Sequence, residues 1–149
     1  MEQLFQAQPG AFDFLTLVLR LALGLVILPH GAQKLLGWFG GDGYRGTLAY
    51  FRTLRIPYPL GILDIIAEFF GSLALILGFL TRPAAFGIGA VMVTVAIMIH
   101  RPHGFFMNWE GTQQGEGFQF HILAAGIALV LVVTGGGAWS LDALLAARF

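Results

Sequence analysis

The sequence contains no cysteine among its 149 residues. This absence excludes disulfides, thiolate metal sites and cysteine-based redox relays, so a redox role would require a bound cofactor or substrate. Charged residues are also scarce: they make up 11% of the chain, whereas an average soluble domain is about a quarter charged. The formal net charge is zero, so nothing indicates a nucleic-acid partner.

Motifs for metals and phosphates are missing as well. The glycines form no phosphate-cradling loop, and no zinc-binding spacing such as HExxH occurs. His100, His103 and His121 could approach one another, and His30 with His121 could ligate a haem through two imidazoles. Neither arrangement matches a recognised ligand spacing. We therefore predict no metal site and disfavour a haem, and the cofactor is left open.

What the chain has in abundance is apolar sequence. Hydrophobic residues make up 57% of it, and the mean hydropathy is +0.79. A membrane-spanning helix needs about 20 mostly apolar residues. Four segments fit, at residues 14–36, 60–80, 83–99 and 118–134. We predict an all-α, multi-pass integral membrane protein. It forms a single domain over residues 1–149, a four-helix bundle in the lipid bilayer.

The connections predict further details. Loop 1 covers residues 37–59, and its stretch "TLAYFRTL" at 47–54 predicts a short interfacial helix. Loop 2 is the tight turn "TRP" at 81–83, and loop 3 covers 100–117. After a glycine break, Ser140 is a plausible N-cap, with Asp142 in the first turn of a short C-terminal interfacial helix.

An even number of spans places both termini on one side and loops 1 and 3 on the other. Arginines are more frequent on the loop 1 and loop 3 side. There the sequence has Arg45, Arg52, Arg55 and Arg101, against Arg82 and Arg148 on the terminal side. The positive-inside tendency then predicts that loops 1 and 3 are cytoplasmic.

Ionisable residues within the spans predict a polar site at one end of the bundle. His30 and Lys34 are four residues apart near the end of the first span, and Asp64 and Glu68 are four apart on one face of the second. Intramembrane ionisable groups are candidates for function. Counting 1.5 Å per residue from mid-span places most of them in the half next to loops 1 and 3. Those on this side are His30, Lys34, Asp64, His100, His103, Glu116 and His121.

Several local interpretations stay open. Lys34 could extend to the lipid headgroups, or Asp64 could only cap a helix or pair with Lys34. Arg20, alone in the other half, is expected to pair with Glu68, either as a structural ion pair or as part of a site. Pro29 is expected to kink the first helix, and with Gly24 and Gly31 nearby to open space between helices.

These motifs together resemble the DoxX family of small four-helix bacterial membrane proteins, over nearly the whole chain. The matching pieces are Arg20 with His30-Gly31 and Lys34, "EFFGSLALILGFLTR" at 68–82, "MVTVAIMIHRPHGFF" at 92–106 and "GGGAWSLD" at 135–142. One position departs from the pattern. The family commonly has a glutamate where the fourth helix opens, and here Gln119 stands there. A proton carrier at that place would have to be Glu116.

The resemblance implies a location in the bacterial inner membrane. It also implies a membrane oxidoreductase, or a subunit of one, that acts on a quinone-like or small redox substrate with electrons from a partner protein. Under this hypothesis His30 and Glu68 are catalytic and exchange protons. The substrate-binding residues are Arg20, Lys34, Asp64, His100 and His121. The alternative is a non-enzymatic protein that binds or transports a small solute or lipid, or anchors a partner enzyme. Whether the protein is an enzyme or a homo-oligomer stays open.

Overall fold

The computed structural model describes residues 10–148, and all regular structure within them is helical. The first half contains α1 (Ala11–Leu36), the 3₁₀ turn η2 (Trp38–Gly40), α2 (Gly43–Thr53), α3 (Tyr58–Ile66), the π-helical η3 (Ala67–Gly71) and α4 (Ser72–Leu77). The second half contains α5 (Thr81–Val95), the π-helical η4 (Ala96–His100), the 3₁₀ turn η5 (Arg101–His103), α6 (Gln119–Thr134) and α7 (Leu141–Ala146).

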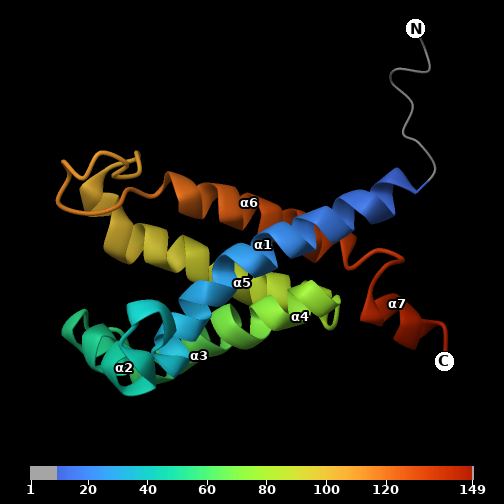
Figure 1. The fold of residues 1–149 in the computed structure, drawn as a ribbon, viewed down its shortest axis with the longest axis horizontal. Helices are drawn as coiled ribbons and strands as arrows, with labels where there is room; N and C mark the ends of the chain where they lie inside the picture. Colours follow the sequence, from blue (N-terminus) through green and yellow to red (C-terminus); the bar gives the residue numbers. More distant parts are fainter. Residues whose placement is uncertain (1–9, 149) are drawn as a thin grey trace, which may run out of the picture.

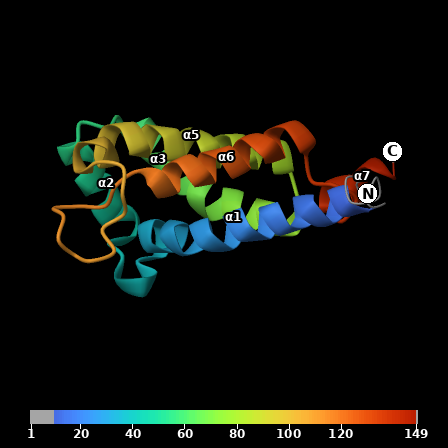
Figure 2. The same cartoon turned by 90° about the horizontal axis from the view of Figure 1, so that it is seen from above.

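Three helical stretches are long and apolar enough to cross a membrane: Ala11–Leu36, Tyr58–Leu77 and Thr81–His103. The fourth, α6, is equally apolar but has 16 residues. They lie side by side in an elongated bundle (Figures 1 and 2). The predicted class, an all-helical membrane bundle, is confirmed. The short helix expected at 47–54 is present as the longer α2. The orientation of the loops in the membrane stays a prediction.

The outer surface and the core are both apolar, as lipid solvation requires. Large side chains such as Leu25, Leu129 and Val133 are exposed around the bundle. The packed core joins all four long helices. It contains Leu23, Ile27, Leu75, Ala85, Ile88, Met92, Ala124, Ala128 and Leu131.

Glycines set the distance between α1 and the second long helix, which consists of α3, η3 and α4 (Tyr58–Leu77). A Cβ on Gly31 would lie 2.5 Å from the Phe69 nitrogen, and one on Gly24 would lie 2.8 Å from Ile76. The expectation that these glycines open space is therefore wrong. They let the two backbones touch, which is the usual role of small residues between membrane helices. In the structure α1 also continues as one helix through Pro29 to Leu36.

The end of the bundle that carries α7 is closed by a network of main-chain hydrogen bonds. Ser140 caps α7 by accepting from the Ala143 nitrogen, as predicted. Asp142 also caps a different helix, because its carboxylate accepts from the nitrogens of Leu80 and Thr81 at 2.7 and 2.9 Å. This cap explains why α5 begins at Thr81 and why the tight turn is 78–80, not the predicted 81–83.

Arg20 belongs to this same end. Its side chain is 1% exposed, and its Nη2 donates to the Trp139 carbonyl at 2.5 Å. The expected pair of Arg20 with Glu68 is wrong, because of register. On α1, Gly31 contacts Glu68 and Phe69, and Gly24 contacts Ser72 and Ile76. Because the two helices run antiparallel, Arg20, which is nearer the start of α1, lies beside the turn at Gly78. The start of α1 and α7 lie together there (Figure 1).

Candidate functional site

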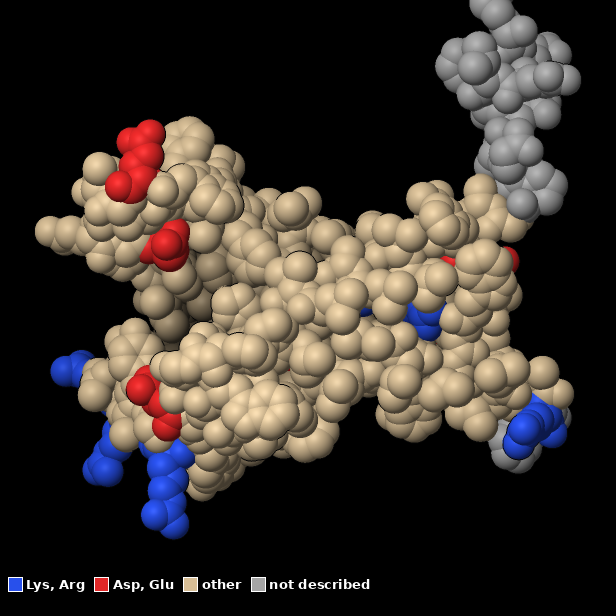
Figure 3. All heavy atoms as spheres, viewed as in Figure 1, with Lys and Arg blue, Asp and Glu red and all other residues tan. Residues whose placement is uncertain are grey.

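A cavity of about 620 Å³ opens at the opposite end of the bundle, on the side of loops 1 and 3. There α5 and α6 diverge from α1, α2 and α3, and the space-filling view shows a notch between the two groups (Figures 1 and 3). Its lining mixes apolar side chains with polar ones. The polar lining includes His30, Gln33, Lys34, Asp42, Thr47, Tyr50, Glu68, His100, Glu116 and His121.

One wall of the cavity carries an ammonium group between two carboxylates. The Nζ of Lys34 lies 2.7 Å from Oδ2 of Asp64 and 2.8 Å from Oε1 of Glu68. Lys34 therefore turns inward, and the reading in which it extends to the headgroups is wrong. If all three groups are ionised, this wall carries one net negative charge. Such a charge is costly away from water, so the wall favours an additional proton or a hydrogen-bond donor on a ligand.

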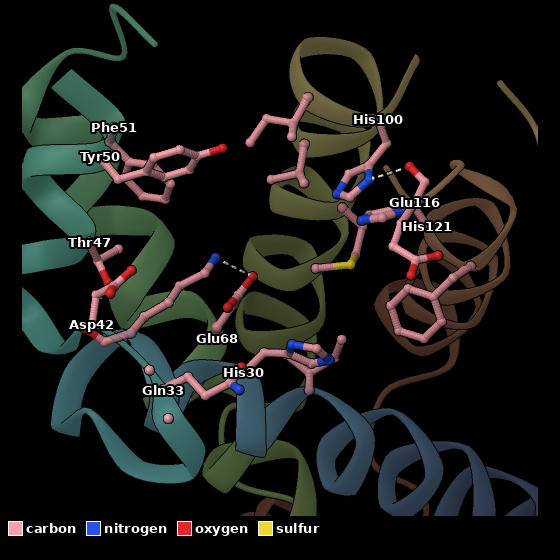
Figure 4. Close-up of a pocket in the computed structure, with 18 of the residues that line it drawn as sticks. His30, Gln33, Asp42, Thr47, Tyr50, Phe51, Glu68, His100, Glu116 and His121 are labelled. Carbon is pink, nitrogen blue, oxygen red and sulfur yellow. Dashed lines mark hydrogen bonds and ion pairs between the residues drawn. The ribbon is translucent and has the colours of Figure 1, made fainter. Parts of the chain in front are cut away.

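Glu68 is the deepest of these groups, with a side chain 3% exposed. Its second oxygen, Oε2, is buried and has no hydrogen-bond partner among the described residues. The close-up shows Glu68 pointing into the cavity, with its ion pair dashed (Figure 4). A buried carboxylate oxygen is normally hydrogen-bonded, so Glu68 keeps an unused acceptor at the edge of the cavity.

The other wall consists of imidazoles. The ring centroids of His100 and His121 are 4.2 Å apart, and the Nδ1 of His100 donates to the Glu116 carbonyl at 2.8 Å. This bond leaves the other nitrogen of a neutral His100 as an acceptor. His121 is 7% exposed, and its Nδ1 is a second buried atom without a partner in residues 10–148. We call Glu68 Oε2 and His121 Nδ1 the cavity atoms.

His30 and helix α2 complete the enclosure. His30 lies on α1 with its ring 6.5 Å from that of Phe120 on α6. From α2, Thr47, Tyr50 and Phe51 line the space, and Thr47 holds α2 to α1 by donating to the Lys34 carbonyl at 3.2 Å. The sequence predicted α2 as an interfacial helix, and its role as one side of the cavity was missed.

Both π-helical segments adjoin the cavity. Glu68 lies in η3 and His100 ends η4. A π segment widens one helical turn and turns the following side chains relative to an α-helix, and such bulges are frequent at functional sites. No local pattern in the sequence marks either segment. The directions in which the side chains of Glu68 and His100 point could therefore not be predicted.

The structure brings together most of the predicted site residues. Five of them line the cavity: His30, Lys34, Glu68, His100 and His121. Asp64 lies behind Lys34 as its ion-pair partner, so the open alternative of an Asp64–Lys34 pair is confirmed. Arg20, predicted to bind substrate, lies at the other end of the bundle. Within the described residues, no group of three or more histidine, aspartate or glutamate side chains could hold a metal ion.

The comparisons with known proteins agree with this architecture. Fold and site define a helical membrane protein with a polar cavity at one end of its bundle. The chain belongs to the DoxX family, whose model matches residues 15–101, so the predicted resemblance is confirmed. It is 33% identical to inner membrane protein YqjF of Escherichia coli K12 over 109 residues, which cover 73% of this chain and 79% of YqjF.

A second relative aligns over more of the chain. Inner membrane protein YphA of the same organism is 30% identical over 144 residues, which cover 88% of this chain and 94% of YphA. No solved structure matches the chain. The names of both relatives give a location and no chemistry, so the activity has to be argued from the cavity.

Proposed function

We propose that the cavity binds a quinone-like molecule and that the protein is an oxidoreductase subunit of the bacterial inner membrane. The observation that carries this proposal is the pair of cavity atoms. They are buried atoms of two side chains on different helices that line one cavity, with apolar residues such as Ile27, Met92 and Ile99 between the polar groups. A quinone has the matching chemistry, because its two carbonyl oxygens lie at opposite edges of an apolar ring.

The residues around the cavity suit the proton part of quinone chemistry. Reduction of a quinone takes two electrons and two protons and gives a quinol. A protonated Glu68 would donate to one carbonyl oxygen, and Lys34 would stabilise the developing oxyanion. An imidazole, His121 or His30, would supply the second proton to the other oxygen. The electrons would come from a reduced electron-transfer protein bound at the same end.

The charge of the loops supports a partner there. Arg45, Arg52, Arg55 and Arg101 lie on loops 1 and 3 or at their ends, and basic side chains project from the cavity end in Figure 3. Basic surfaces attract acidic partners and raise their rate of association. The same arginines would place this end in the cytoplasm.

A binding measurement tests the proposal. The detergent-purified protein is titrated with a tail-less methoxy-substituted benzoquinone, and lipid extracts are analysed by mass spectrometry for a co-purified quinone. We expect saturable binding, weakened about tenfold or more in Glu68→Leu, since a hydrogen bond lost from a buried side chain costs about 1–3 kcal/mol. His30→Leu, at an exposed position that lines the cavity, should weaken binding less. His103→Leu is the matched control, because His103 lies outside the cavity lining.

Two outcomes would overturn the proposal. One is that wild-type protein and His103→Leu show no saturable binding of the benzoquinone. The other is binding that Glu68→Leu leaves unchanged. A protein that co-purifies with phospholipid and binds no quinone would support the non-enzymatic alternative.

A further inference from the structure

A second, apolar space runs along the outside of the bundle between the second long helix (Tyr58–Leu77) and α5. This groove has a volume of about 470 Å³. Small residues give it depth, since its lining includes Ala67, Gly71, Ala84, Gly87 and Ala90. It follows α5 and η4 from Pro83 to Met98, which is about 22 Å along the helix axis. This is a long, narrow, lipid-facing groove.

The groove adjoins the polar cavity. Phe51 and Val95 line both spaces. Asp64 lines the groove and is bonded to Lys34, which lines the cavity. The only acidic side chain in the groove lining thus lies next to the cavity, and the remainder of the groove is apolar apart from Thr94. Polarity falls along one path, from the cavity past Phe51 and Val95 and then along α5.

We propose that the groove holds the apolar tail of the molecule whose polar head occupies the cavity. The ligand is then amphipathic: a quinone with a long isoprenoid or alkyl chain that leaves the cavity between Phe51 and Val95. This inference rests on the proposed function and adds the ligand class and the route by which it enters from the bilayer. Phe51 is 5% exposed, so it packs tightly at the junction and is the side chain that must move for the tail to pass.

The tail gains little from leaving lipid, because lipid chains are as apolar as the groove. Its contribution comes from close packing against the small side chains, and affinity alone would reveal it poorly. The informative measurement is therefore the position of the tail.

Photocrosslinking measures that position. The probe is a benzoquinone with a decyl tail that carries a diazirine at its end, added to the purified full-length protein and irradiated. Peptide mapping is expected to find the label on 83–98 or on 60–71. An excess of the tail-less benzoquinone should remove most of this label, because it displaces the head from the cavity.

Two variants with the same substitution sharpen the result. Ala90 and Ala22 are both exposed, but Ala90 lines the groove and Ala22 lies on α1 outside it. Ala90→Phe should reduce groove labelling several-fold while binding of the tail-less compound is unchanged. Ala22→Phe should leave both unchanged.

Three outcomes would overturn the inference. The first is label that falls on other segments. The second is groove label that the tail-less competitor does not reduce, because bilayer lipids alone would then occupy the groove. The third is equal labelling of Ala90→Phe and wild type. Failure of the proposed function looks different, since the tail-less benzoquinone would then not bind at all.

Discussion

The two ends of the bundle both bury charged side chains, but they use them for different purposes. At the α7 end, Arg20 and Asp142 bind main-chain groups of the turn at 78–81 and of the segment before α7. Asp13 likewise accepts from the Ala138 nitrogen at 2.7 Å. At the other end, Lys34 binds Asp64 and Glu68, and the cavity atoms belong to side chains that line an open space.

The contrast separates structural from functional use of polarity. Main-chain groups in a turn have fixed positions, so side chains bonded to them hold segments together. Unused hydrogen-bonding capacity occurs at both ends, since Nε and Nη1 of Arg20 and Oγ1 of Thr81 are also buried without a partner in residues 10–148. At the cavity end, however, such atoms belong to side chains that line an open space. Substitutions at the α7 end should therefore cost stability and not binding. Those around the cavity should cost binding, and they should cost stability as well only where a buried charge loses its partner. Three substitutions test this division, from the largest expected effect to the smallest.

The largest effect is expected for Lys34→Met. It leaves two buried carboxylates without their cation, and breaking a buried ion pair costs about 3–5 kcal/mol. We expect that loss in the free energy of unfolding, measured by denaturant titration in detergent. The loss should be smaller in acid, because protonation removes the uncompensated charges.

The control for Lys34→Met is the triple variant with Asp64→Asn and Glu68→Gln. It has no buried charge in this group, and we expect it to recover most of the lost stability. A triple variant as unstable as Lys34→Met alone would show that Lys34 stabilises the bundle by packing and not by charge.

A smaller loss is expected for Asp142→Ala at the α7 end. The substitution removes the cap of α5 and both bonds to the turn, where Leu80 has a left-handed φ of 49°. Losing a cap with a charged acceptor costs about 2 kcal/mol. Thermal unfolding should show this loss, and benzoquinone binding at the far end should be unchanged.

Glu110→Ala is the matched control, because Glu110 is an exposed acid in loop 3 and the change removes the same charge. It should leave the unfolding temperature unchanged. If Asp142→Ala weakened benzoquinone binding as much as stability, the division between the two ends would be wrong.

The smallest effect on stability is expected for His121→Leu. The variant removes a buried imidazole nitrogen that finds no partner in residues 10–148. A polar group buried without a hydrogen bond is unfavourable, so the free energy of unfolding should rise or change by less than about 1 kcal/mol. Binding of the tail-less benzoquinone should nevertheless fall at least tenfold. A variant that binds normally would remove His121 from the site.

Much of the architecture follows from the sequence alone. Apolar runs of sufficient length predicted the helices, because a bilayer admits only segments that satisfy their own backbone hydrogen bonds. A constant rise per residue placed His30, Lys34, Asp64 and His121 at one end, and Glu68 near the middle of its span, before any contact was known. The Ser140 cap was also predictable, because a cap depends only on neighbours within one helical turn.

Tertiary structure decided which of these residues meet. The sequence led us to expect Arg20 as the partner of Glu68. The actual partner, Lys34, depends on the register of α1 against the second long helix, which Gly24 and Gly31 fix through contacts distant in sequence. Packing between helices also decides two further features. These are the π segments that carry Glu68 and His100, and the position of α2 beside the cavity. Local sequence determines a helix and its depth in the membrane. Its rotation and its partners are set by the helices packed against it.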